Sequence, residues 1–189
     1  MSNDDLLNTI ETLLFAHVPE AVADARILEP VYCLRIWYHG SDTWGSDRTP
    51  GLMLPKESWR LHVLSEKGSE AAHYLWCADE MDTGDKSLWA KIENGLIIES
   101  CRMWYRLRYA DPDDGMTQQE ALRPFREMLQ RACGRLNLLD WKGIAAVTED
   151  FVVFPADWSH MFCDDYGDML ASVPAAKIEV LRRRSVIEI

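Results

Sequence analysis

The sequence predicts an α+β fold, a single domain in which a mainly antiparallel sheet packs against several helices. Segments with the three- and four-residue spacing of amphipathic helices occur beside short runs of β-branched and aromatic residues. The length of 189 residues, with 48% hydrophobic and 27% charged residues, suits one globular domain with a buried core. No repeat, linker or low-complexity tract divides the chain, so the domain is expected to span residues 1–189.

The N-terminal part predicts a helix followed by a central strand. Residues 4–17 place apolar side chains at helical spacing, and Asn3 or Asp4 can cap the first amides. Val31–His39 has apolar side chains on both faces, which is typical of a central strand held between helices or other layers. The polar stretch Gly40–Pro55, rich in Gly, Ser, Asp and Pro, is expected to form an irregular loop.

The middle of the chain predicts two short strands and a helix. Trp59–Leu64 and His73–Cys77 are strand candidates, and Gly68 lies in the link that would join them as a hairpin. Asp85–Glu93 is expected to be helical and to end at Asn94-Gly95.

The segment Leu96–Tyr109 fits two structures. As a strand it would place Cys101 on one face and Arg102 on the other, whereas as a helix it would stack Arg102 over Arg106. We favour the helix.

The C-terminal part contains the clearest local signals. Thr117–Glu120 is a capping box that starts a helix running to about Leu136. Ile144–Thr148 and Phe151–Phe154 are apolar runs joined by two acids, and they predict a hairpin. Ser172-Val-Pro174 is expected to start a last helix, with proline at an early position where its missing amide is harmless.

Charge and cysteine usage restrict the class of protein. The net charge of −11 disfavours binding to nucleic acid or an anionic membrane and favours a basic protein partner. Five cysteines without a CxxC pair predict reduced thiols and a cytoplasmic protein. The acidic start Met-Ser-Asn-Asp-Asp is unlike a signal peptide, and no apolar stretch is long enough to cross a membrane.

The known catalytic and metal-binding motifs do not occur. Asp111–Gly115 resembles a calcium loop, but the glycine and the following glutamate fall out of register. His160–Asp165 has no second histidine or cysteine pair at zinc spacing. The chain has no GxSxG elbow, phosphate loop or GxGxxG sequence. We therefore predict no catalytic residue, no metal site and no cofactor.

The most distinctive segment is acidic and aromatic. From Gly143 to Ala176 there is no Lys or Arg, while acids alternate with aromatic residues. Such a surface attracts a basic partner and offers aromatic anchors. The predicted partner-binding residues are Asp157, Trp158, Phe162, Asp164, Asp165, Tyr166 and Asp168. The alternative is a solvated acidic loop that covers a hydrophobic edge, and the preceding basic segment 116–148 is expected to neutralise part of this acidity internally.

The order of several motifs resembles a known group of proteins. The motifs are an N-terminal helix, the strand Val31–His39, Tyr74-Leu-Trp76, Leu136-Asn137, the strand Thr148–Phe154 and Ser172-Val-Pro174. Together they resemble an uncharacterised group of small acidic bacterial cytosolic proteins, some regarded as immunity proteins of polymorphic-toxin systems. The resemblance implies a partner-binding role and supplies no catalytic residue.

Three functions are therefore weighed. The first is a non-enzymatic acidic binding protein, an immunity protein or antitoxin that neutralises a basic toxin by direct binding. The second is a hydrolase with a dispersed Asp/Glu/His site, which a deep pocket holding His160 or His73 beside a carboxylate would favour. The third is a housekeeping subunit that forms a homodimer through exposed members of its eight tryptophans.

The acidic segment generates the first prediction. Changing Asp164 and Asp165 to lysine should lower the rate of association with a basic partner without unfolding the domain, because the change removes two steering charges. Stopped-flow association kinetics, with circular dichroism as the folding control, measure both quantities. Unchanged association would remove these two residues from the binding surface.

Overall fold

The computed structural model describes residues 2–38, 49–76, 84–108, 115–157, 162, 165–184 and 186–187. The elements in chain order are α1 (Asn3–Asp24), β1 (Val31–Tyr38), β2 (Gly51–Pro55), α2 (Glu57–Lys67), the 3₁₀ turn η1 (Gly68–Glu70), α3 (Ala71–Trp76), β3 (Ser87–Ala90), α4 (Gly95–Arg108), α5 (Gln118–Leu136), the 3₁₀ turn η3 (Trp141–Gly143), β4 (Val147–Asp157), α6 (Asp165–Ser172) and α7 (Ala175–Arg183).

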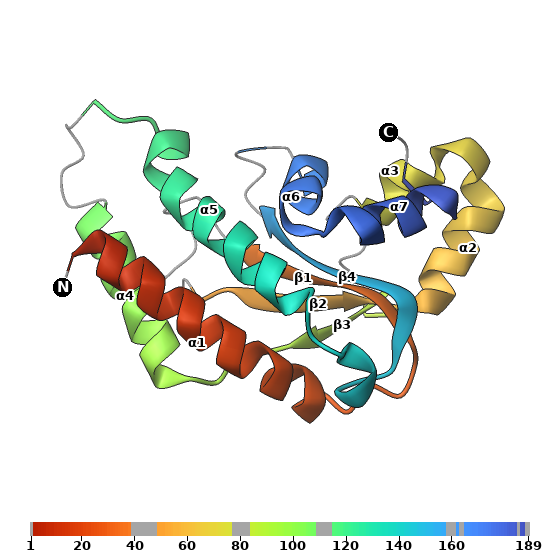
Figure 1. The fold of residues 1–189 in the computed structure, drawn as a ribbon, viewed down its shortest axis with the longest axis horizontal. Helices are drawn as coiled ribbons and strands as arrows, with labels where there is room; N and C mark the ends of the chain where they lie inside the picture. Colours follow the sequence, from red (N-terminus) through yellow and green to blue (C-terminus); the bar gives the residue numbers. More distant parts are fainter. Residues whose placement is uncertain are drawn as a thin grey trace.

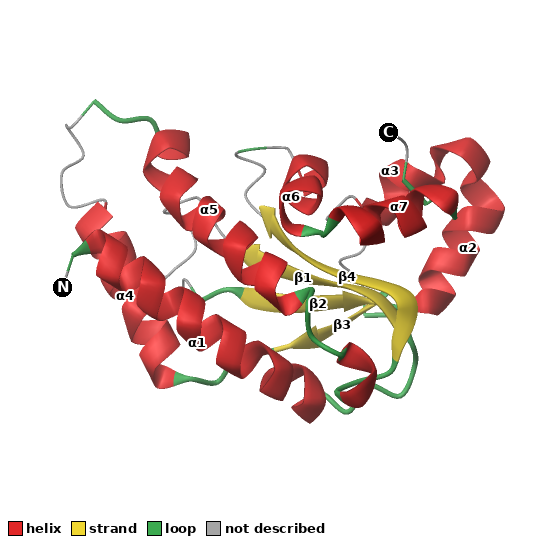
Figure 2. Cartoon of the chain, viewed as in Figure 1, coloured by secondary structure: helices red, strands yellow, loops and turns green. Residues whose placement is uncertain are grey.

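The described strands form one four-stranded sheet in the order β3-β2-β1-β4 (Figure 2). The pairs β1–β2 and β2–β3 are antiparallel, whereas β1 and β4 run parallel. The α+β prediction is confirmed, and the sheet is mixed because the chain returns through several helices before β4 joins β1. Strand β2 begins at Gly51, whose missing side chain leaves room for the indole of Trp37 on β1.

Helices cover both faces of the sheet and create two hydrophobic cores (Figure 1). Helices α1, α4 and α5 cover one face, and α2, α3, α6 and α7 cover the other. Strand β1 supplies Leu34 and Ile36 to the first core and Cys33 to the second, so the predicted central strand is confirmed. An irregularity in the β1–β4 register between Val31 and Cys33 puts Tyr32 in the second core with Cys33.

Several sequence-based predictions in the first half of the chain are wrong. The supposed hairpin strands Trp59–Leu64 and His73–Cys77 fall on helices α2 and α3 over their described residues, where Arg60 and Val63 share a buried face three residues apart. The supposed helix Asp85–Glu93 contains the strand β3, and the supposed loop Gly40–Pro55 ends in β2. Short apolar runs do not distinguish helix from strand, and here the pairing of β2 with β3 decides the structure.

The predicted hairpin at residues 144–154 is also wrong. One continuous strand, β4, runs through Glu149-Asp150, because Asp150 is buried and bound to a distant arginine instead of lying in a turn. The helix predicted over residues 4–17 is present, but it continues through Pro19 to Asp24, and its N-cap is Ser2 instead of Asn3 or Asp4. Residues 96–108 belong to a helix, which confirms the favoured alternative for that segment.

The helix predicted to follow Thr117 and to run to about Leu136 agrees with α5. The Thr117 hydroxyl accepts the Glu120 N–H at 3.2 Å, and Glu120 Oε2 accepts the Thr117 N–H at 2.9 Å, so the capping box is formed. The last helix, predicted to start at Ser172-Val-Pro174, begins slightly later: Ser172 ends α6, and Pro174 is the residue before the first residue of α7.

The outer edge of β4 is closed by side chains. The Val153 N–H donates to Asn137 Oδ1 at 2.9 Å, and Asn137 Nδ2 donates to the Val153 carbonyl at 2.6 Å. Two residues before Val153, the Phe151 carbonyl accepts a hydrogen bond from Lys177 Nζ at 2.9 Å. These contacts satisfy groups that would otherwise be able to pair with a strand of another chain.

Two further features bear on the class of protein. Cys33, Cys101 and Cys133 are buried and form no disulfide. Burial raises the pKa of the Cys33 thiol to about 12, so this thiol is unreactive at neutral pH. Over the described residues, none of the helices combines the length and the apolar character that crossing a membrane requires.

The Asn137 contacts generate the second prediction. Its amide also donates to the carbonyls of Cys133 and Ser172, so Asn137→Leu should leave several buried polar groups unsatisfied. We expect the free energy of unfolding to fall by about 3 kcal/mol or more, measured by urea denaturation. The control is Asn8→Ala on the exposed face of α1, which should change the free energy of unfolding by less than about 0.5 kcal/mol. Equal stability of the Asn137 variant would contradict the edge-closing role.

Candidate binding site

Two of the predicted partner-binding acids lie inside the protein. Asp168 is fully buried, and its Oδ1 accepts hydrogen bonds from Arg126 Nε at 2.6 Å and Gln130 Nε2 at 2.7 Å. Asp157, at the end of β4, is 2% exposed and accepts the Phe162 N–H at 2.8 Å. Burial removes both carboxylates from any surface that a partner can touch. The expectation that segment 116–148 neutralises part of the acidity is met by Arg126.

The other predicted residues are placed as follows. Phe162 is half-buried, and the Arg126 guanidinium lies 4.6 Å above its ring. Tyr166 is half-buried and packs against the second core. Asp165 is the first residue of α6, and Trp158 and Asp164 lie outside the described residues. The structure therefore brings Asp157, Phe162 and Asp168 together as an internally bonded cluster.

A buried tyrosine adjoins this cluster. Tyr38 ends β1 opposite Asp157 in the parallel register, and its side chain packs against Phe125. Burial, together with the carboxylates of Asp168 and Asp157, raises the pKa of the phenol well above its ordinary value. The phenol therefore stays protonated and neutral.

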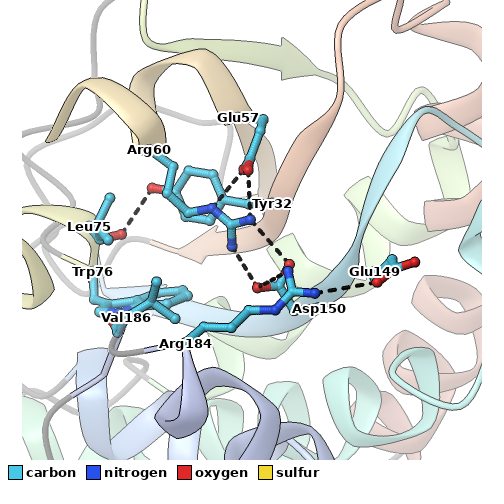
Figure 3. A network of polar contacts seen from close by, with 9 residues as sticks. All are labelled: Tyr32, Glu57, Arg60, Leu75, Trp76, Glu149, Asp150, Arg184 and Val186. Atoms are coloured by element: carbon cyan, nitrogen blue, oxygen red, sulfur yellow. Dashed lines mark hydrogen bonds and ion pairs between the residues drawn. The ribbon is translucent and has the colours of Figure 1, made fainter. Parts of the chain in front are cut away.

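A second set of charges lies near the start of β4 (Figure 3). Arg60 of α2 donates to Asp150 Oδ2 at 2.8 Å and contacts Glu57 at 2.6 Å, with its guanidinium 5.1 Å from the Tyr32 ring centroid. Arg184, which follows α7, reaches Asp150 at 3.2 Å and Glu149 at 3.3 Å. This ionic network joins α2, β4 and the C-terminal segment.

The pKa of Asp150 shows that the ionic network outweighs the cost of burying its carboxylate. Burial acts to raise this pKa, but the hydrogen bonds and positive charge of Arg60 outweigh it, and the pKa lies below its ordinary value. The charges of the ionic network are thus satisfied by one another, and we assign the network a structural role.

An open pocket of about 660 Å³ lies between the C-terminal half of α1 and the segment 89–94 that leads from β3 to α4. We call it the α1 pocket. Its lining includes the exposed carboxylates Glu20, Asp24 and Glu93, together with the exposed Lys91. The last turn of α1 has no basic residue, so the negative end of its helix dipole adds to the acidic side chains.

His17 in this pocket has both ring nitrogens engaged. Nδ1 lies 2.6 Å from Glu20 Oε2, and Nε2 lies 2.9 Å from Asn94 Nδ2. Asn94 Oδ1 accepts the Leu96 and Ile97 N–H groups at 3.0 and 3.2 Å, so the amide caps α4 and turns its nitrogen toward His17. In this arrangement Nε2 accepts a hydrogen bond and Nδ1 carries the proton.

The other two described histidines, His62 on α2 and His73 on α3, lie beside aromatic residues. The His62 ring is tilted relative to the Trp59 ring, with 5.7 Å between centroids, and the His73 ring meets the Tyr74 ring edge-on, with 5.5 Å between centroids. His39 and His160 lie outside the described residues. Over the same described ranges, no cluster of three or more His, Cys, Asp or Glu side chains is arranged to hold a metal ion.

Comparison of the chain with protein-family models, with curated proteins and with solved structures finds no match.

Sequence reasoning missed the α1 pocket because its two walls lie far apart in the chain. A signal was nevertheless present: Glu20 and Asp24 stand near the C-terminal end of a long helix, where basic residues are normally favoured.

The ionic network generates the third prediction. Asp150→Asn removes the fully buried counter-charge of Arg60 and should lower the free energy of unfolding by about 3–5 kcal/mol at pH 7. The neighbouring control Glu149→Gln removes only an exposed contact and should change it by less than about 0.5 kcal/mol. Urea denaturation measures both.

The pH dependence follows from the lowered pKa of Asp150. Because the folded carboxyl binds a proton less readily than the unfolded one, its contribution is complete above about pH 4 and is lost as the pH falls through the folded value. Asp150→Asn should lack this part of the acid dependence. An unaltered acid profile in the variant would contradict the assignment.

Proposed function

We propose that the protein is a non-enzymatic binding protein that holds a basic protein partner, and that it acts as an immunity protein or antitoxin. The observation that carries the proposal is the α1 pocket, where Glu20, Asp24 and Glu93 are exposed at the negative end of α1. Acidic side chains, a helix dipole and a concave surface coincide at this location.

The contrast with the buried acids supports this assignment. Asp150 and Asp168 form ion pairs with arginines of the same chain, so their negative charges are neutralised within the protein. The pocket carboxylates of Asp24 and Glu93 make no ion pair with the chain's own arginines or lysines in the described residues. Exposed charge of one sign attracts a partner of the opposite sign and accelerates encounter.

The hydrolase alternative called for a deep pocket that holds His160 or His73 beside a carboxylate, whereas the histidine of the α1 pocket is His17. A general base needs a nitrogen lone pair facing the substrate, whereas Nε2 of His17 accepts a hydrogen bond from Asn94 and Nδ1 faces Glu20. A toxin that acts on nucleic acid must present a basic surface to its substrate, and an acidic protein bound there would block access by complementary charge.

The fourth prediction tests the location of binding. Asp24→Lys/Glu93→Lys should slow association with the basic partner by about tenfold or more at low salt, because it reverses two pocket charges. Lysine at position 24 suits the end of α1, so stability should be maintained. The matched control Glu66→Lys/Glu70→Lys makes the same change in net charge near the end of α2 and should have a smaller effect.

The partner is obtained by affinity purification from the native host, and its toxicity is assayed with and without co-expression of this chain. Association should slow steeply as ionic strength rises, because salt screens exposed charges. Equal slowing in the pocket variant and its control would refute the pocket as the docking surface. Recovery of no basic protein would refute the function itself.

A further inference from the structure

The side-chain amide of Asn94 connects the start of helix α4 with His17 on helix α1. Its Oδ1 accepts the Leu96 and Ile97 N–H groups at the start of α4, and its Nδ2 donates to His17 Nε2 on α1. An amide has one oxygen and one nitrogen, so this arrangement works only while Nε2 of His17 carries a lone pair. The capping of α4 is thereby linked to the protonation state of a residue on another helix.

Protonation of His17 creates a conflict at this amide. Because Glu20 already receives the proton on Nδ1, the added proton must occupy Nε2, where it points at the NH₂ group of Asn94. Rotating the amide would present Oδ1 to the imidazolium, but it would turn NH₂ toward the Leu96 and Ile97 N–H groups and remove their acceptor. The single amide oxygen of Asn94 cannot accept hydrogen bonds from the imidazolium and from the α4 N–H groups at the same time.

We propose that His17 and Asn94 form a proton-sensitive clamp, in which protonation of His17 releases the N-terminal cap of α4 and reshapes the α1 pocket. Both residues line that pocket, and histidine is the side chain that normally changes charge between about pH 5 and 8.

The surrounding charges are compatible with this behaviour. Glu20 and Asp24 of α1 and Lys91 and Glu93 of the segment before α4 line the same pocket as His17. On the α5 side, Arg131 and Arg135 are paired with Glu11, at 3.0 and 3.5 Å. Carboxylates titrate near pH 4 and lysine near pH 10, so a transition between pH 5 and 8 belongs to histidine.

The regulatory consequence rests on the proposed function. A protonated His17 adds a positive charge to the acidic pocket, and the uncapped start of α4 no longer holds residues 89–94 against α1. A basic partner bound in the α1 pocket is therefore released as the pH falls toward 5.

The clamp is tested first on the free chain by NMR. Across pH 5 to 8, the amide shifts of Leu96 and Ile97 should move with the same midpoint as the His17 ring, and hydrogen-exchange protection of the first turn of α4 should fall about fivefold. Amides that stay unchanged while the His17 ring titrates would overturn the proposal.

Two variants sharpen the test. Asn94→Asp supplies two acceptor oxygens, one for α4 and one for the imidazolium, so the cap should persist through the His17 titration. His17→Gln has no titrating group and should abolish the transition at Leu96 and Ile97. A transition that persists in either variant would contradict the clamp.

Binding is measured separately with the partner recovered from the host. Affinity for the wild-type chain should fall by about tenfold between pH 7.5 and 5.5, and by less for Asn94→Asp. A chain that shows the NMR transition but binds no basic protein would refute the proposed function and leave the clamp intact. The absence of the NMR transition in a chain that binds would refute the clamp alone.

Discussion

Strand β1 is hydrogen-bonded to β2 on one side and to β4 on the other, and side chains on both of its faces are buried. The parallel pairing with β4 is the constraint from which the rest of the fold follows. Parallel strands need a long crossover connection, and a sheet that is apolar on both faces needs a helical layer on each. The chain meets both needs with α1, α4 and α5 on one face and α2, α3, α6 and α7 on the other. The outer edge of β4 is then closed by Asn137 and Lys177.

The charges of the chain fall into two groups with different roles. The first group consists of buried carboxylates that arginines bind. Asp150 is bound by Arg60, and Asp168 is bound by Arg126. Leaving either acid unpaired in the interior would be strongly unfavourable. The carboxylates at the end of α1 remain in water around a pocket, where they strengthen the negative end of a helix. The second group is the one that we connect with a basic partner, and the His17–Asn94 contact makes that surface sensitive to protonation.

The sequence predicted the parts of the fold that depend on neighbouring residues. The capping box at Thr117 and Glu120 and the central character of β1 could be read locally, since cap spacing and apolar alternation are local patterns. Strands β2 and β3 were missed because they are defined by their pairing with each other. Asp150 suggested a turn because adjacent acids are usually exposed, whereas its partner Arg60 lies 90 residues away. The same reasoning placed Asp157 and Asp168 on the surface, and the pocket went unrecognised because its walls are separated in the chain.

A hydrogen-exchange footprint of the complex tests most directly whether a basic partner is held in the α1 pocket. Chain bound to the partner recovered from the host is compared with the free chain, peptide by peptide. Binding in the α1 pocket should add protection in the last turns of α1 and in residues 89–97, with little change in α2, α3 and α7. Protection confined to α6 or to the α2–α3 region, with α1 unchanged, would contradict it.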